Sequence, residues 1–277
     1  MLIVDSQVHV WGADAPQRPW PKRAEPQRPI PLDHDDLLRE MNAAGVDRVV
    51  IVPPSWEGDR NDLAIEAAVA HPQRFATMGR LDPQDPASRG RIAKWREQSG
   101  MLGLRFTFHI PQLASLITEG HMDWVWGEAQ DARVPIYVLV PHSLVHLIDG
   151  VAQRYPELKL VMDHLALNSK QRDAEAFAEF DKLLAIAKRP NVAAKASALP
   201  CYTNDTYPYR SLHQYVRRAY DAFGPQRLFW GTDLSRSPIP YRQHVTMFTE
   251  EIPWLTHEDK EWIMGRGVCE WLGWEMD

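Results

Sequence analysis

The chain alternates short apolar runs with longer amphipathic stretches from one end to the other. Residues 135–140, Pro-Ile-Tyr-Val-Leu-Val, are apolar at nearly every position, which is typical of a strand buried on both faces. Residues 32–44 instead carry apolar positions at helical spacing, with acidic residues in the first turns and Gly45 as a stop. The pattern therefore predicts buried strands that alternate with helices.

About eight such units follow one another along the chain. The predicted strands cover residues 2–9, 46–52, 74–80, 102–108, 135–140, 158–163, 191–197 and 227–231. The predicted helices cover residues 32–44, 59–70, 86–98, 122–132, 144–155, 173–188, 209–223, 241–250 and 258–268, and a Pro-rich loop covers residues 12–31.

Eight strand–helix units in 277 residues predict an α/β fold, a closed (β/α)8 TIM barrel, with residues 1–277 as a single domain. The alternative is an open doubly wound sheet. It is disfavoured because no Gly-rich turn follows the first strand and no P-loop occurs.

Composition narrows the class of protein further. The formal charge is −6 with no long block of either sign, so we expect no nucleic-acid partner. No apolar run reaches the roughly 18 residues of a membrane span, and the start of the chain lacks a signal-peptide pattern. The two cysteines are far apart in sequence and suggest no disulfide framework. We expect a cytoplasmic protein that acts on a small molecule, and a homo-oligomer stays open.

If the barrel is right, chemistry belongs at the carboxyl ends of its strands. On the first strand, period-two alternation sends Asp5, Gln7 and His9 to one face, predicted to be the barrel interior, while Val4 and Val8 pack outward. Three polar side chains at the mouth of a barrel predict a functional site. The alternative is a hydrogen-bonded cluster that only closes the barrel.

Other predicted strands also carry polar residues within them or at their ends. These residues are Arg80, Arg105, His109, His142, Asp163, His164, Lys195 and Asp233. A single histidine in such a place is more often structural, so the recurrence at successive strands is the signal for an active site.

Several of these segments resemble the amidohydrolase superfamily, specifically its amidohydrolase-2 group. The resemblance rests on residues 5–11, Gly103-Leu104-Arg105, Asp163-His164, Lys195-x-Ser197, Trp230-Gly231-Thr232-Asp233 and the closing stretch 263–274. It runs over nearly the whole chain in matching order. The group includes lactonases for sugar acids and pyrone dicarboxylates, and nonoxidative decarboxylases of aromatic acids.

The resemblance implies roles for individual residues. His9, His142, His164 and Asp233 match catalytic positions of the family, whereas Gln7 stands where the first histidine of a His-x-His pair belongs. An amide is a poorer zinc ligand than imidazole. We therefore expect no required cofactor. The alternative is one divalent metal, zinc or manganese, held by His9, His142 and Asp233.

The function expected from these residues is hydrolysis of a small carboxylated or hydroxylated lactone. Asp233 would activate water and the three histidines would polarise the carbonyl. Substrate-binding candidates for an anionic molecule are Arg105, Arg80, Lys195 and Gln7, with Arg236 as a further one. Alternatives are decarboxylation of an aromatic acid, metal-dependent amide hydrolysis, and a binding protein without catalysis. Loop residues Trp11, Trp20 and Trp56 suggest an apolar wall, or packing on the barrel rim.

Overall fold

All eight predicted strands form and lie in one sheet. In the computed structural model, which describes residues 1–21 and 25–276, consecutive strands pair in parallel in the order β1 to β8. The strands are β1 Val4–Val8, β2 Arg48–Ile51, β3 Phe75–Gly79, β4 Met101–Thr107, β5 Ile136–Leu139, β6 Leu160–Met162, β7 Val192–Ser197 and β8 Leu228–Gly231. The predicted (β/α)8 barrel is confirmed.

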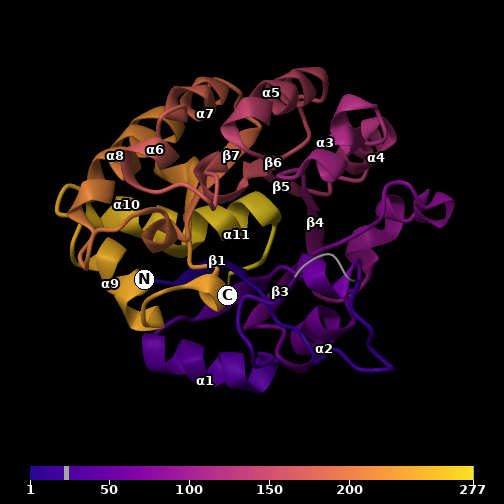
Figure 1. Cartoon of the computed structure of the whole chain (residues 1–277), viewed down its shortest axis with the longest axis horizontal. Coiled ribbons are helices and arrows are strands. Elements are labelled where there is room, and N and C mark those ends of the chain that lie inside the picture. Colours follow the sequence, from indigo (N-terminus) through magenta and orange to yellow (C-terminus); the bar gives the residue numbers. More distant parts are fainter. Residues whose placement is uncertain (22–24, 277) are drawn as a thin grey trace.

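Helices surround the strands (Figure 1). The α-helices are α1 His34–Ala44, α2 Asp62–Ala70, α3 Pro111–Thr118, α4 Asp123–Asp131, α5 Val145–Arg154, α6 Asp173–Ala176, α7 Phe180–Ile186, α8 Arg210–Phe223, α9 Tyr241–Thr249, α10 His257–Glu261 and α11 Gly267–Leu272. A π-helical turn, Trp262–Arg266, joins α10 to α11. Short 3-10 turns follow several strands, among them Asp163–Ala166 after β6 and Leu234–Arg236 near the end of β8.

The barrel closes where β8 returns to β1. There the Asp233 backbone N–H donates to the Gln7 carbonyl at 2.9 Å. The Asp5 carboxylate accepts hydrogen bonds from the Thr232 backbone N–H at 2.9 Å, the Thr232 hydroxyl and the Tyr241 hydroxyl at 2.8 Å. A side chain therefore supplies part of the pairing at this seam.

A bulge in β1 corrects the prediction that Asp5, Gln7 and His9 share one face. Asp5 pairs with Val49 and Val8 pairs with Ile51, so three steps along β1 match two steps along β2. The extra residue reverses the alternation and leaves Gln7 and His9 pointing into the barrel while Asp5 lies on the opposite side. Val4, which was expected to face outward, packs in the barrel interior.

Two predicted helices are divided in the structure, and one observed helix was not predicted. The predicted helix 86–98 is two 3-10 turns, Pro86–Ser88 and Ile92–Glu97, because Gly90 between them adopts φ +75°. The predicted helix 173–188 is divided into α6 and α7, and α3 had no predicted counterpart. Part of the predicted loop 12–31, residues 22–24, lies outside the described residues.

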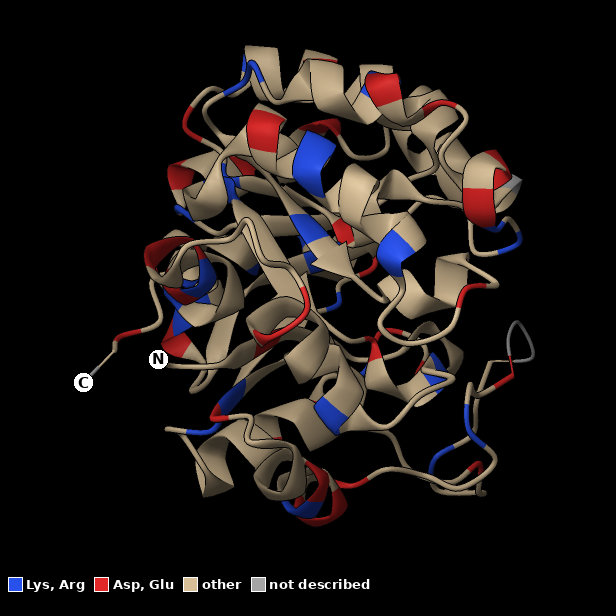
Figure 2. Cartoon of the chain, turned by 90° about the vertical axis from the view of Figure 1, so that its left-hand side faces the viewer, with Lys and Arg blue, Asp and Glu red and all other residues tan. Residues whose placement is uncertain are grey.

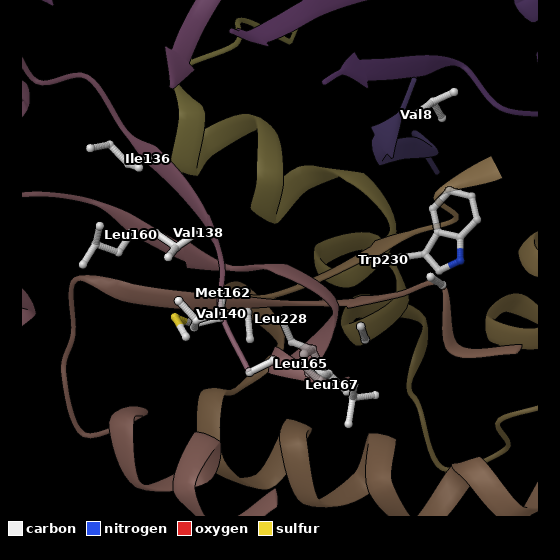
Figure 3. Close-up of a cluster of buried hydrophobic side chains, with 14 of the residues drawn as sticks. Val8, Ile136, Val138, Val140, Leu160, Met162, Leu165, Leu167, Leu228 and Trp230 are labelled. Atoms are coloured by element: carbon white, nitrogen blue, oxygen red, sulfur yellow. The ribbon is translucent and has the colours of Figure 1, made fainter. Parts of the chain in front are cut away.

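Two apolar clusters hold these layers together. The larger joins outward-facing strand residues to the surrounding helices, and Figure 3 shows members from β1, β5, β6 and β8. The smaller lies inside the barrel, where strand residues such as Val50, Met78 and Val161 pack against Val268 and Leu272 of α11. Helix α11 thus fills one end of the barrel and leaves the other end for the site.

Charged residues of both signs are interspersed over the helices (Figure 2). Within the described part of the chain, no helix combines the length and apolarity that a bilayer span requires.

Candidate active site

A cavity of about 460 Å³ opens at the carboxyl ends of the strands. Eight of the residues singled out in the sequence line it: Gln7, His9, Trp56, Arg105, His109, His164, Asp233 and Arg236. Further lining residues include Glu25, Gln27, Lys170 and Tyr202. Side chains from β1, β4 and the turns after β6 and β8 therefore meet in one site, as the barrel geometry predicts.

Asp233 lies at the centre of the polar contacts. Its Oδ1 is 3.1 Å from His9 Nε2, and its Oδ2 is 3.6 Å from His164 Nε2 and accepts a hydrogen bond from Arg236. Apart from this contact with His9, Oδ1 is buried and makes no hydrogen bond within the described residues. That oxygen has lone pairs available to a small molecule in the cavity.

Both imidazoles beside Asp233 are fixed from behind. His9 Nδ1 is 2.6 Å from the Val52 carbonyl, which can only accept, so Nδ1 carries a proton and Nε2 faces Asp233. His164 Nδ1 is 2.7 Å from the Ser197 hydroxyl at the end of β7. These second contacts set the orientation of the rings toward the carboxylate.

His164 and Asp233 share an unusual backbone conformation. Both have φ of +51°, in the left-handed region that residues other than glycine rarely adopt. Each is the second residue after the end of its strand, so the chain turns sharply at the point where the side chain enters the site. Such conformations cost of order 1–3 kcal/mol each and cluster at functional sites.

The environment separates the protonation states of these groups. Burial alone raises the pKa of Asp233, but Arg236 and the neighbouring His9 hold it well below its ordinary value. Burial lowers the pKa of His164 to about 3 despite the attraction of Asp233. Burial, aided by Arg105 and Arg236, lowers the pKa of His109 to about 4. Near neutral pH the site thus holds an ionised Asp233 and neutral His109 and His164.

A second charged cluster lies beneath the first. Lys195 Nζ is 2.7 Å from Asp163 Oδ1 and donates to Gln7 Oε1, and Arg105 Nε donates to Asp163 Oδ2 at 3.2 Å. Lys195 and Asp163 are fully buried and neither lines the cavity. Burial lowers the pKa of Lys195 to about 8, opposed by the Asp163 carboxylate.

Besides Lys195, two predicted site residues lie outside the cavity lining. His142 places Nε2 at 3.0 Å from the Leu165 carbonyl and its ring 6.1 Å from that of Phe180. Arg80 pairs with Asp59 at 3.3 Å.

Among the tryptophans, Trp56 lines the cavity and meets His9 edge-on at 5.4 Å. Trp11 packs behind Trp56, and Trp20 is not part of the wall.

The sequence reasoning missed Tyr202 and Lys170. Tyr202 accepts a hydrogen bond from Arg236 at 2.8 Å, and both residues line the cavity. Tyr202 ends the 3-10 turn Leu199–Tyr202 after β7, and Lys170 lies in the loop after β6, where no strand-end rule points to them. The resemblance included Ser197, but its contact with His164 could not be deduced from the sequence.

The residues expected to bind a metal do not converge in the cavity. His142 is directed to a backbone carbonyl, and the Gln7 oxygen receives the Lys195 ammonium, which would repel a divalent cation. In residues 1–21 and 25–276, the one group of three His, Cys, Asp or Glu side chains with converging ligand atoms is His34, Asp35 and His71, which lies outside the cavity lining.

The fold and the strand-end site define an amidohydrolase-type barrel, and the comparison with known proteins agrees. The model of the family described as Amidohydrolase matches residues 4–266, so the chain belongs to this family of enzymes. An L-fucono-1,5-lactonase from Burkholderia ambifaria is 26% identical over 250 residues, covering 83% of this chain and 79% of that protein. A 4-sulfomuconolactone hydrolase from Hydrogenophaga intermedia is 22% identical over 239 residues, covering 84% and 74%.

Solved structures share the fold along the whole chain. An amidohydrolase from Burkholderia multivorans with bound zinc has a TM-score of 0.79 at 21% identity, covering 99% of each chain. A 5-carboxyvanillate decarboxylase from Novosphingobium aromaticivorans, complexed with manganese, has a TM-score of 0.70 at 15% identity, covering 98% of this chain and 96% of that one. At these identities the likeness concerns the fold.

Proposed function

We propose that this protein hydrolyses a small lactone that carries a carboxylate group. The observation that carries the proposal is Asp233 Oδ1. This buried carboxylate oxygen makes no hydrogen bond in the described chain besides its contact with His9, and it lies beside a cavity that Arg105, Lys170 and Arg236 also line. The two relatives named as lactone hydrolases support the same reaction class.

Asp233 is the proposed general base. It takes a proton from water while the water oxygen bonds to the lactone carbonyl carbon and the carbonyl electrons move to oxygen. The ring C–O bond then breaks, and the departing alkoxide takes the proton back to give a hydroxy acid. His9 and His164 hold the carboxylate in position, and the low pKa of Asp233 keeps it ionised throughout the neutral range.

Arg105 is the proposed anchor for the substrate carboxylate. Its Nε is held by Asp163, which fixes the plane of the guanidinium where it borders the cavity. A guanidinium in a fixed plane pairs with a carboxylate through two parallel hydrogen bonds. Arg236 and Lys170 add positive charge along the same cavity and favour an anionic ligand.

The proposed reaction needs no divalent metal. We expect protein purified without added metal to contain well under one equivalent of zinc or manganese, and to keep most of its activity after dialysis against a chelator. Near-stoichiometric metal whose removal abolishes activity, with recovery on adding zinc back, would overturn this part of the proposal.

A panel of substrates tests the reaction class. Five- and six-membered lactones, each with and without a carboxylate, are assayed by proton release, and matched amides and aromatic acids by amine and carbon dioxide release. We expect turnover of lactones only, with higher kcat/KM for the carboxylated member of each pair. Carbon dioxide release from an aromatic acid without lactone turnover would replace hydrolysis with decarboxylation.

A further inference from the structure

The side chain of Gln7 is held so that its amide group has only one possible orientation. Gln7 is fully buried on β1 and lines the cavity, and its Oε1 receives a hydrogen bond from Lys195 Nζ. An ammonium has donors and no acceptor, so the amide oxygen must face Lys195 and the NH2 group must face away from it.

The NH2 group of Gln7 has no acceptor in the described part of the chain. Gln7 Nε2 is buried and makes no hydrogen bond there. Buried polar groups of folded proteins are nearly always paired, so an unpaired donor at the wall of a cavity marks the place of a ligand acceptor. The group it would meet is an oxygen atom.

Lys195 makes this donor both rigid and strong. The ammonium is fully buried, 2.7 Å from Asp163 Oδ1 and 3.9 Å from the centre of the Tyr137 ring. Contacts on several sides leave it little freedom. A positive charge beside the amide oxygen draws electrons from the nitrogen, so the N–H groups donate more strongly than those of an ordinary amide.

Gln7 and the proposed base lie together at the closing seam of the barrel. The Asp233 backbone N–H donates to the Gln7 carbonyl at 2.9 Å, and both side chains line the same cavity. A lactone between them would have one group to deliver water and another to receive the negative charge that forms on its carbonyl oxygen.

We propose that the Gln7 side-chain N–H donates to the lactone carbonyl oxygen and to the oxyanion formed when water adds, and that Lys195 is the positioning residue that aims it. The inference rests on the proposed lactone hydrolysis. The ammonium–amide pair supplies the positive polarisation that a bound metal would otherwise give, at the position where the family resemblance predicts a histidine. The electron pair of the C=O π bond moves to the carbonyl oxygen when water adds. It forms the C=O double bond again when the ring C–O bond breaks.

Two substitutions at Gln7 test the donor. Gln7→Met keeps the length of the side chain and removes the N–H, and Gln7→Glu keeps the shape and puts an oxygen where the donor was. We expect kcat to fall about 10²–10³-fold in both, as when an oxyanion donor is lost, with KM changed less than about fivefold. Gln214→Met, an exposed position on α8, is the matched control and should keep wild-type kcat.

A test of Lys195 requires a variant in which Asp163 is not left as a buried charge without its ammonium partner. Lys195→Met alone leaves Asp163 short of a cation, so the double variant Lys195→Met/Asp163→Asn is compared with Asp163→Asn. We expect the added Lys195→Met change to lower kcat at least tenfold while KM stays within about fivefold. A loss that appears only as lowered Tm, with kcat of the folded fraction unchanged, would make Lys195 purely structural.

A spectroscopic measurement reads the contact directly. A substrate lactone with a ¹³C-labelled carbonyl is bound to the inactive Asp233→Asn variant, and its infrared carbonyl stretch is recorded. We expect a lower frequency than in water, and loss of this additional shift in Asp233→Asn/Gln7→Met. Wild-type lactonase activity together with a Gln7→Met kcat within threefold of wild type would overturn the Gln7 assignment alone. A wild type inactive on every lactone would overturn the proposed function and this inference with it.

Discussion

Asp163 and Asp233 are two aspartates in nearly the same kind of place, but their surroundings differ. Each follows a barrel strand, each is almost fully buried, and each is contacted by cationic or imidazole groups. Asp163 faces Lys195 and Arg105 below the cavity, whereas Asp233 lines the cavity. Residue type and strand-end position are therefore insufficient to distinguish a structural counter-ion from a candidate base. What distinguishes them is that Asp233 borders the cavity and Asp163 does not.

Neutralising the cavity carboxylate tests the difference between the two aspartates most directly. Asp233→Asn keeps the shape of the side chain but removes its proton affinity, so we expect kcat to fall about 10²–10⁴-fold. Folding should be largely kept, because Arg236 is partly exposed and retains its contact with Tyr202. Circular dichroism and steady-state kinetics measure both effects. A variant with a tenth or more of wild-type kcat would rule out Asp233 as the base.

The same substitution at the other carboxylate should act on stability. Asp163→Asn leaves Lys195 and Arg105 with no buried counter-charge, and breaking a buried pair on one side costs about 3–5 kcal/mol. Urea unfolding measures the loss. Asp149→Asn is the matched control: Asp149 pairs with Arg189 at a partly exposed site, so its loss should cost about 1 kcal/mol or less. Equal losses at the two positions would contradict the structural role of Asp163.

Arg105 connects the two clusters, because it lines the cavity and also contacts Asp163. Arg105→Ala should raise KM for a carboxylated lactone about 10–100-fold, and Arg105→Lys should recover part of the loss because the planar fork is absent. Arg80→Ala removes a neighbouring guanidinium outside the cavity lining, so KM should change less than about threefold. An unchanged kcat/KM in Arg105→Ala would exclude it as the anchor.

Much of the fold and the general place of the site could be predicted from the sequence. Buried strands such as β5 are apolar on both faces, as expected for a parallel sheet with both faces covered. Placing the site at the carboxyl ends of the strands then brought Gln7, His9, Arg105, His164 and Asp233 together in advance.

The errors have physical causes that the sequence does not display. One extra residue in β1 reverses the alternation and places the Asp5 side chain on the opposite side of the strand from that of Gln7, and nothing in Asp5-Ser6-Gln7 identifies a bulge. His142 follows β5 as predicted, but the direction of a side chain in a turn depends on the nearest acceptor, here the Leu165 carbonyl. Tyr202 reaches the cavity from a loop, where the tertiary structure alone sets its position.

A pH-dependent effect on stability concerns Asp5, the residue that the bulge places at the barrel seam. Burial raises its pKa to about 6 even though Thr232, Gln7 and Tyr241 donate hydrogen bonds to the carboxylate. A group whose pKa is higher in the folded state than in the unfolded state binds its proton more tightly when folded. Its contribution to stability is therefore fully present below about pH 4 and is lost as the pH rises through about 6.

Asp5→Asn removes this titration and keeps an oxygen acceptor for the Thr232 backbone N–H. The free energy of unfolding of the wild type minus that of Asp5→Asn should thus decrease between pH 4 and pH 7, by about 1.4 kcal/mol for each unit of pKa shift. Other carboxylates titrate in both proteins and cancel in the difference. Asp149→Asn gives the opposite sign: the hydrogen bond from Arg189 lowers the Asp149 pKa, so the wild type gains relative stability as the pH rises. Urea unfolding at several pH values measures both slopes. A difference for Asp5→Asn that is independent of pH would mean that Asp5 keeps an ordinary pKa at the seam.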